Sequence, residues 1–225
     1  MDDKVAMSEM LDRIRGIKEE IEEALWALDV RGDIEKALAV YRQAELNLQA
    51  LDVSADDAAY GEQQRVLAYC LLRQGNVLRH MGEPEHALCL GRRELAAASA
   101  SGDDVALARS LISNGTNQVV AGAMVEGLEM MEQARELFES GDSYDHQQGL
   151  GWYWILQADL ANGGITGTGP REAVEAADRA LEILKPIENR PGVARAYAAR
   201  AKAYEALGNE EQAAEDREAQ EVYTG

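Results

Sequence analysis

The sequence predicts an all-α fold built from helix–turn–helix units, and three observations support that prediction. Its 225 residues include one Phe and four Pro, and Ala and Glu are abundant, which is a helical rather than a β-sandwich composition. Apolar residues make up 46% of the chain and recur with the 3.6-residue period of amphipathic helices. A glycine-centred turn also repeats along the chain, which indicates an internal repeat.

Four turns share the repeated pattern, in which a Gly is followed five residues later by Ala or Gly. A left-handed Gly ends one helix, and small residues on both sides of the turn let two helices pack closely. The residue seven positions before the Gly is small in three of the four turns. The turn glycines are Gly32, Gly82, Gly122 and Gly208, the residues five later are Ala37, Ala87, Gly127 and Ala213, and those seven earlier are Leu25, Gly75, Gly115 and Ala201.

These turns, with a longer Gly-rich loop at 163–169 before Pro170, divide the chain into five helix pairs within one domain spanning 1–225. Asp or Ser in the linkers 52–56, 101–102 and 141–143 precedes the next helix, where such residues cap the N-terminus. Acidic pairs such as Asp56–Asp57 are therefore interpreted as caps rather than magnesium ligands. The predicted helices are 4–30 and 33–51 (unit 4–51), 57–81 and 84–100 (unit 57–100), 103–121 and 124–140 (unit 103–140), 145–162 and 170–186 (unit 145–186), and 192–207 and 210–222 (unit 192–222).

The units resemble the tetratricopeptide repeat (TPR), which has an aromatic residue and small residues at fixed spacing. Successive units lie 40 to 50 residues apart, from Ala173 to Ala213 and from Ala37 to Ala87, against the usual 34, so the chain resembles the longer-helix variety. Where the TPR pattern usually has a Leu directly before the small residue of the first helix, this chain has other residues, for example Gln74 and Arg200. The matching residues are Trp154, Ala158, Ala173 and Pro186; Tyr197, Ala201, Tyr204 and Ala213; and Ala37, Tyr41 and Ala44.

The resemblance implies a right-handed α-solenoid whose first helices line a concave groove that binds a peptide or protein segment. Arginine in such a groove suits carboxylates, because guanidinium forms two parallel charge-assisted bonds. The family's carboxylate clamp uses Lys and Asn, but Leu72 and Arg109 occupy the Lys positions, so a partial clamp is expected. The alternative is that Arg73, Arg79 and Arg109 neutralise acids of the chain itself. The family register places these residues in the groove: Trp26, Tyr69, Arg73, Asn76, Arg79, Arg109, Ser113, Thr116, Trp152, Asp159 and Lys202.

The formal charge of −19 argues against nucleic acid as a partner, because phosphate contacts need a basic surface. The first residues, 1–4, show no leader and no apolar run spans a membrane, so a cytoplasmic protein is expected. The cysteines Cys70 and Cys89 are interpreted as small apolar residues in helices, and the acids of second helices as a solvated surface.

Enzyme chemistry finds little support in the sequence. Glu83–His86 matches half of a di-iron motif with no second half, and no histidine stands at a recognised spacing from a nucleophile. We therefore expect no metal, no cofactor and no catalysis. The leading function is a non-enzymatic adaptor that binds a peptide or protein segment bearing acidic residues or a C-terminal carboxylate.

Two other functions stay open. The first is a self-assembling structural or regulatory subunit, with a possible homodimer through the apolar N-terminal helix, which carries Met7, Met10, Leu11, Ile14, Ile17 and Ile21. The second is an atypical all-α enzyme, which would need convergent carboxylates or histidines in one pocket.

Overall fold

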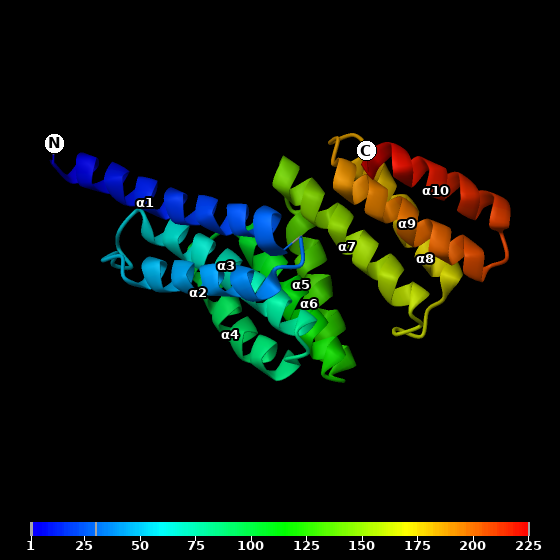
Figure 1. The fold of residues 1–225 in the computed structure, drawn as a ribbon, viewed down its shortest axis with the longest axis horizontal. Helices are drawn as coiled ribbons and strands as arrows, with labels where there is room; N and C mark the ends of the chain where they lie inside the picture. The colour runs from blue at the N-terminus through cyan, green and yellow to red at the C-terminus, as the bar shows by residue number, and fades with distance from the viewer. Residues whose placement is uncertain (1, 30, 225) are drawn as a thin grey trace. The chain divides into compact units, whose positions relative to one another are not determined.

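The computed structural model describes residues 2–29 and 31–224, and these residues form ten α-helices and one π-helical segment with no strand (Figure 1). The all-α prediction is therefore confirmed. The first predicted helix is shorter than expected, since it ends at Ala24 and continues as a π-helix; Val30, its predicted last residue, lies outside the described residues. The elements are α1 (Asp2–Ala24), η1 (Leu25–Asp29), α2 (Ile34–Gln49), α3 (Tyr60–His80), α4 (Pro84–Ser101), α5 (Asp104–Val120), α6 (Met124–Glu139), α7 (Tyr144–Asn162), α8 (Pro170–Leu184), α9 (Arg190–Ala206) and α10 (Glu210–Thr224).

The glycine turns close as the sequence predicts. Gly32, Gly82, Gly122 and Gly208 have φ angles of 88°, 77°, 89° and 77°, in the left-handed region that favours glycine. In each turn the next backbone N–H donates to the carbonyl five residues earlier, for example Asp33 to Leu28 over 2.9 Å and Glu83 to Leu78 over 2.8 Å. This is the Schellman motif, which satisfies the last carbonyls of a helix.

Two of the expected caps are present and one is not. Ala106 N donates to Asp103 Oδ1 over 2.8 Å at the start of α5, and His146 N donates to Ser143 Oγ over 3.4 Å at the start of α7. The expectation for Asp56–Asp57 is wrong, because α3 begins at Tyr60 without a side-chain cap. Asp57 instead accepts a 2.7 Å hydrogen bond from Ser54 N, which lies in the same linker.

The chain divides into two compact units, Met1–Ala134 and Arg135–Gly225, with the boundary inside α6 and thus inside the predicted repeat 103–140. In unit 1, α3 packs against α1 and α2, and α5 packs against α3 and α4. In unit 2, α9 packs against α7 and α8, and α10 packs against α9. Within each unit the first helix of a pair therefore lies against both helices of the preceding pair, which is the packing of a helical-repeat protein.

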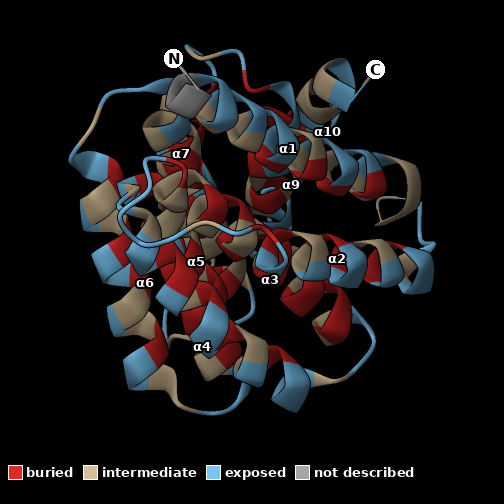
Figure 2. Ribbon diagram, turned by 90° about the vertical axis from the view of Figure 1, so that its left-hand side faces the viewer, coloured by how far each residue is buried: buried red, intermediate tan, exposed pale blue. Residues whose placement is uncertain are grey.

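Unit 1 has a continuous apolar core beneath α1, α2 and α3. Ile14, Ile21, Tyr41 and Leu48 are fully buried in it, and Figure 2 shows buried and exposed positions alternating along α1 and α2. The other apolar residues of the N-terminal helix that suggested a homodimer, Met7, Met10, Leu11 and Ile17, belong to this core or pack against it. The dimer therefore stays a prediction.

The close-packing explanation for the small residues holds at one turn and fails at another. A Cβ added to Gly115 of α5 would lie 2.6 Å from the carbonyl oxygen of Gly127 on α6, whereas a Cβ on Gly75 would meet nothing within 4 Å. The interpretation of Gly75 as a close-contact residue is therefore wrong. None of the described helices combines the length and apolar character needed to cross a membrane.

Candidate functional site

The α3 helix of unit 1 presents an aromatic and basic face. Tyr69, Arg73 and Asn76 follow one another at spacings of four and three residues, which places them on one side of the helix. The Arg73 Cζ atom lies 5.9 Å from the centre of the Tyr69 ring, within the range of a cation–π contact. Burial raises the pKa of Tyr69, and the charge of Glu22 of α1 adds to the increase, whereas the nearby Arg73 and Arg109 oppose it. Arg109 of α5 therefore lies close to this α3 face.

Arg79 is held in this face by amides. Its Nη1 donates to Asn117 Oδ1 of α5 over 2.6 Å, and its Nη2 donates to Asn76 Oδ1 of its own helix. Burial lowers the pKa of Arg79, but an arginine stays protonated in proteins. The hydrogen bonds fix the position of this charge without neutralising it.

Glu94 of α4 is a functional candidate that the sequence reasoning missed. The expectation that second-helix acids are solvated is wrong for this residue, which is 1% exposed. Ser113 Oγ of α5 donates to its Oε2 over 3.1 Å, while its buried Oε1 has no hydrogen-bond partner among the described residues. Its place in the series Ala87, Gly91, Glu94 and Ala98, all buried on one helical face, is the sequence signal that could have identified it.

The environment of Glu94 decides its charge. Burial raises its pKa to about 8, although hydrogen bonds from Ser110 and Ser113 and the charge of Arg79 oppose the increase. The carboxyl group is therefore mostly protonated at neutral pH. A neutral Glu94 leaves the positive charge of Arg79 uncompensated.

The arginines of α3 differ from other arginines of the protein in their partners. No carboxylate of the described residues forms an ion pair with Arg73 or Arg79. By contrast, Arg93 of α4 pairs with Glu45 of α2. In unit 2, Arg200 binds Asp216 through two bonds of 2.6 and 2.8 Å and also contacts Asp178. Arg200 thus joins α8, α9 and α10, which explains the charged residue where the TPR pattern has Leu.

The other predicted groove residues of unit 1 differ from one another in burial and in their contacts. Ser113 is buried against Glu94, and Thr116 Oγ1 donates to the carbonyl of Ile112 in its own helix over 2.8 Å. Trp26 lies in η1 and is 64% exposed. Tyr69, Arg73, Asn76 and Arg79 are half-buried, as is Arg109. The structure thus brings together Tyr69, Arg73, Asn76, Arg79 and Arg109, which we call the basic face.

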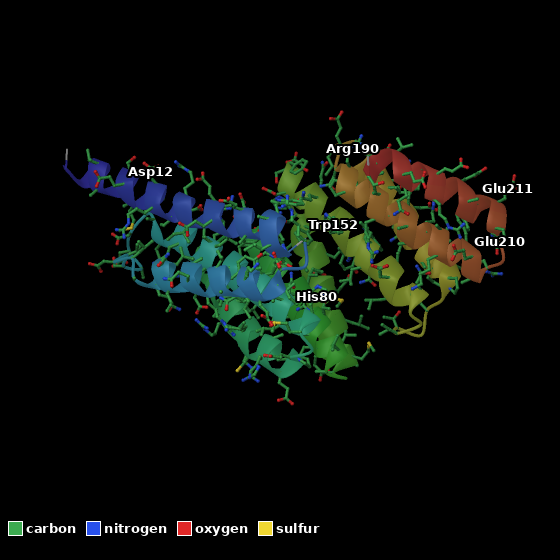
Figure 3. The ribbon with its side chains drawn as sticks, viewed as in Figure 1. Asp12, His80, Trp152, Arg190, Glu210 and Glu211 are labelled. Atoms are coloured by element: carbon green, nitrogen blue, oxygen red, sulfur yellow. The ribbon has the colours of Figure 1, made fainter. Side chains whose placement is uncertain are left out.

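Three predicted residues belong to unit 2. Trp152 lies on α7 (Figure 3) and is 41% exposed, and Lys202 of α9 is exposed. Asp159 of α7 accepts a 2.7 Å bond from Arg195 Nη2 of α9, so its charge is compensated inside the unit. These residues lie outside the unit that carries the basic face.

The remaining chemistry-bearing residues do not form a second reactive centre in the described part of the chain. No group of three or more His, Cys, Asp or Glu side chains there is placed to hold a metal ion. Cys70 is buried with its Sγ 3.0 Å from the Tyr41 carbonyl oxygen, and burial raises its thiol pKa to about 12. Cys89 is exposed, contrary to its interpretation as a small apolar residue.

Comparison with solved structures shows a TPR-like fold. BtubC (BKLC) from P. vanneervenii superposes with a TM-score of 0.59 at 15% identity, over 96% of this chain and 91% of that one. A Podosopora anserina putative kinesin light chain with nearly identical TPR-like repeats gives a TM-score of 0.53 at 16% identity, over 95% of this chain and 96% of that one. No family model and no curated protein matches the sequence. The protein therefore has the fold of TPR-like helical-repeat proteins.

Proposed function

We propose that this protein is a protein-interaction adaptor whose basic face in unit 1 binds an acidic segment or a chain-terminal carboxylate of a partner protein. One observation carries the proposal: Arg73 and Arg79 have no carboxylate ion pair among the described residues. This is notable in a chain with 41 acidic and 22 basic residues, where partners of opposite charge are abundant.

The arrangement suits recognition of carboxylates. Each hydrogen bond from a guanidinium to a carboxylate contributes about 1.5–3 kcal/mol. Asn117 and Asn76 hold Arg79, and Tyr69 contacts Arg73, so less side-chain entropy is lost when a ligand binds. The protonated Glu94 supplies no competing negative charge at neutral pH.

The proposal is tested with a fluorescein-labelled acidic octapeptide that has a free C-terminal carboxylate, by fluorescence anisotropy. The double variant Arg73→Glu/Arg109→Glu should weaken binding at least tenfold, because it replaces attraction with repulsion. Arg42→Glu/Arg92→Glu is the matched control, since both residues are exposed on second helices of unit 1 and the net charge changes equally. The control should stay within about twofold of the wild type.

Helicity and melting temperature are measured for all three proteins, so that a folding defect is distinguished from a binding defect. An amidated form of the peptide separates recognition of the terminal carboxylate from recognition of acidic side chains. Equal loss of binding in both double variants would mean that net charge alone attracts the peptide. That result, or undiminished binding by a folded Arg73→Glu/Arg109→Glu variant, would disprove the proposal.

A further inference from the structure

Glu94 connects a second helix of unit 1 to the basic face. It lies on α4, which packs against α3 and α5, the two helices that carry the basic face. Its Oε2 accepts the 3.1 Å hydrogen bond from Ser113 Oγ of α5. A negative charge on Glu94 would stabilise the protonated form of Arg79 on α3. One carboxyl group therefore adjoins both helices of the proposed binding site.

The surroundings of this carboxyl group favour its neutral form. Glu94 is 1% exposed, and its buried Oε1 has no hydrogen-bond partner among the described residues. Burying an unpaired charge costs much more free energy than burying a neutral group, so the proton is retained. If the proton is lost, the buried carboxylate needs a cation close to it.

Arg79 is that cation. It is the charged group that acts on the Glu94 carboxyl, and its guanidinium is bonded to the amides of Asn117 and Asn76 rather than to a carboxylate of the described residues. The charge of Arg73 also repels that of Arg79, which favours an anion beside them. An ionised Glu94 and a partner carboxylate therefore compete for the same positive charge.

The other titratable groups on the helices around Glu94 do not interfere with this competition between pH 6.5 and 9. Asp104 and Arg109, the charged residues of α5, do not act on the Glu94 carboxyl. On α3, burial raises the pKa of Tyr69 above its usual value and that of Cys70 to about 12, so both stay protonated in this range.

We propose that Glu94 is a pH-sensitive regulator of the basic face, an inference that rests on the function proposed above. Protonated Glu94 leaves the charge of Arg79 to the partner carboxylate, whereas ionised Glu94 neutralises Arg79 and weakens binding. Because the two equilibria are linked, a bound partner must also make Glu94 hold its proton more tightly. The carboxyl group loses its proton near pH 8, so affinity is highest below that pH and falls as the pH rises through it.

The test measures the dissociation constant of the acidic octapeptide by titration calorimetry at pH 6.5 and at pH 9. The peptide has an acetylated N-terminus, so none of its groups titrates in this range. The dissociation constant of the wild type should increase about fivefold or more between the two pH values. For Glu94→Gln the ratio of the two constants should be close to one. Glu85→Gln, exposed on the same helix, is the matched control and should keep the wild-type ratio.

Two further measurements do not depend on the folding of Glu94→Gln. The Ser113 hydrogen bond favours ionised Glu94, so Ser113→Ala should move the loss of binding to higher pH. Wild-type calorimetry at pH 8 in Tris and in triethanolamine, two amine buffers with different ionisation enthalpies, should show net uptake of protons on binding. Circular dichroism at both pH values confirms that each protein keeps its helicity.

The outcomes separate this inference from the proposed function. Binding by the wild type with equal constants at both pH values, without proton uptake, would overturn the regulation by Glu94 and leave the basic face as the binding site. A folded Glu94→Gln protein with the wild-type ratio would overturn it too. Absence of binding at both pH values would contradict the proposed function, and the regulation would fall with it.

Discussion

Glu94 shows how one buried carboxyl group sets the charge of its surroundings. Glu94 is 1% exposed, and burial raises the pKa of its carboxyl group to about 8. Arg79 is the charged group close enough to oppose that increase. A buried acid that stays protonated avoids the larger free-energy cost of burying a charge. The same protonation leaves Arg79 able to attract an external anion.

Glu94 should make the protein less stable as the pH rises from about 4.5 to about 8. The unfolded chain releases the proton near the ordinary pKa of 4.5, whereas the folded protein keeps it until about 8, so in this window the folded state binds more protons and loses stability with increasing pH. Glu94→Gln removes this contribution. Urea denaturation at pH 5 and at pH 8 measures the free energy of unfolding of both proteins. The value for the variant minus that for the wild type should increase from pH 5 to pH 8, by an amount on the order of a few kcal/mol.

Other acids also titrate, so Glu215→Gln serves as the control at an exposed position of α10. The difference in free energy of unfolding between Glu215→Gln and the wild type should be the same at both pH values. If Glu94→Gln behaves like this control, Glu94 is ionised in the folded protein and the proposed charge state of the basic face is wrong.

At the scale of the helix, the repeated glycines have separate physical roles. The turn glycines adopt positive φ angles and end their helices. Gly75 and Gly115 occupy the same place in the repeat but meet different surroundings, because only Gly115 faces a backbone carbonyl of the neighbouring helix. Sequence position alone therefore does not reveal which of the two is required for packing.

Alanine substitution should separate these two glycines. Gly75→Ala should stabilise the protein by about 0.5–1 kcal/mol, since Ala loses less conformational entropy than Gly in a helix. Gly115→Ala should destabilise it by about 1–3 kcal/mol, because the new Cβ would lie 2.6 Å from Gly127 O and force the helices apart. Chemical denaturation measures both. The packing argument fails if the two variants shift the free energy of unfolding in the same direction.

At the scale of the whole molecule, the charge of −19 acts on every part of the chain. Repulsion among like charges opposes the compact state, and salt screens it over about 10 Å at 0.1 M. We expect the melting temperature to rise between about 0.01 and 0.3 M NaCl in differential scanning calorimetry. Binding of the acidic octapeptide should weaken over the same range, because its attraction to the basic face is screened. A falling melting temperature would mean that the ion pairs outweigh the net charge.

Much of the candidate site could be predicted from the sequence because it lies on one helix. Tyr69, Arg73 and Asn76 share a face through the 3.6-residue period alone, and the repeat register added Arg109 from the next first helix. Asn117 and Glu94 were not predicted, because their contacts with Arg79 and Ser113 join different helices. Conversely, Asp159 and Ser113 were predicted as groove residues, but the structure engages them with Arg195 and Glu94.

The sequence by itself determined the helices, their turns and most of their caps, because these depend on interactions within a few residues: glycine in the left-handed region, Asp or Ser at an N-terminus, and apolar residues with helical spacing. The tertiary structure alone decided the burial of Glu94, the close contact at Gly115 and the open space at Gly75. It also decided which arginines find a carboxylate: Arg200 does, while Arg73 and Arg79 find none among the residues that the structure describes. Each of these depends on which side chains neighbouring helices bring within a few ångströms, and that distance is set by packing between segments far apart in the chain.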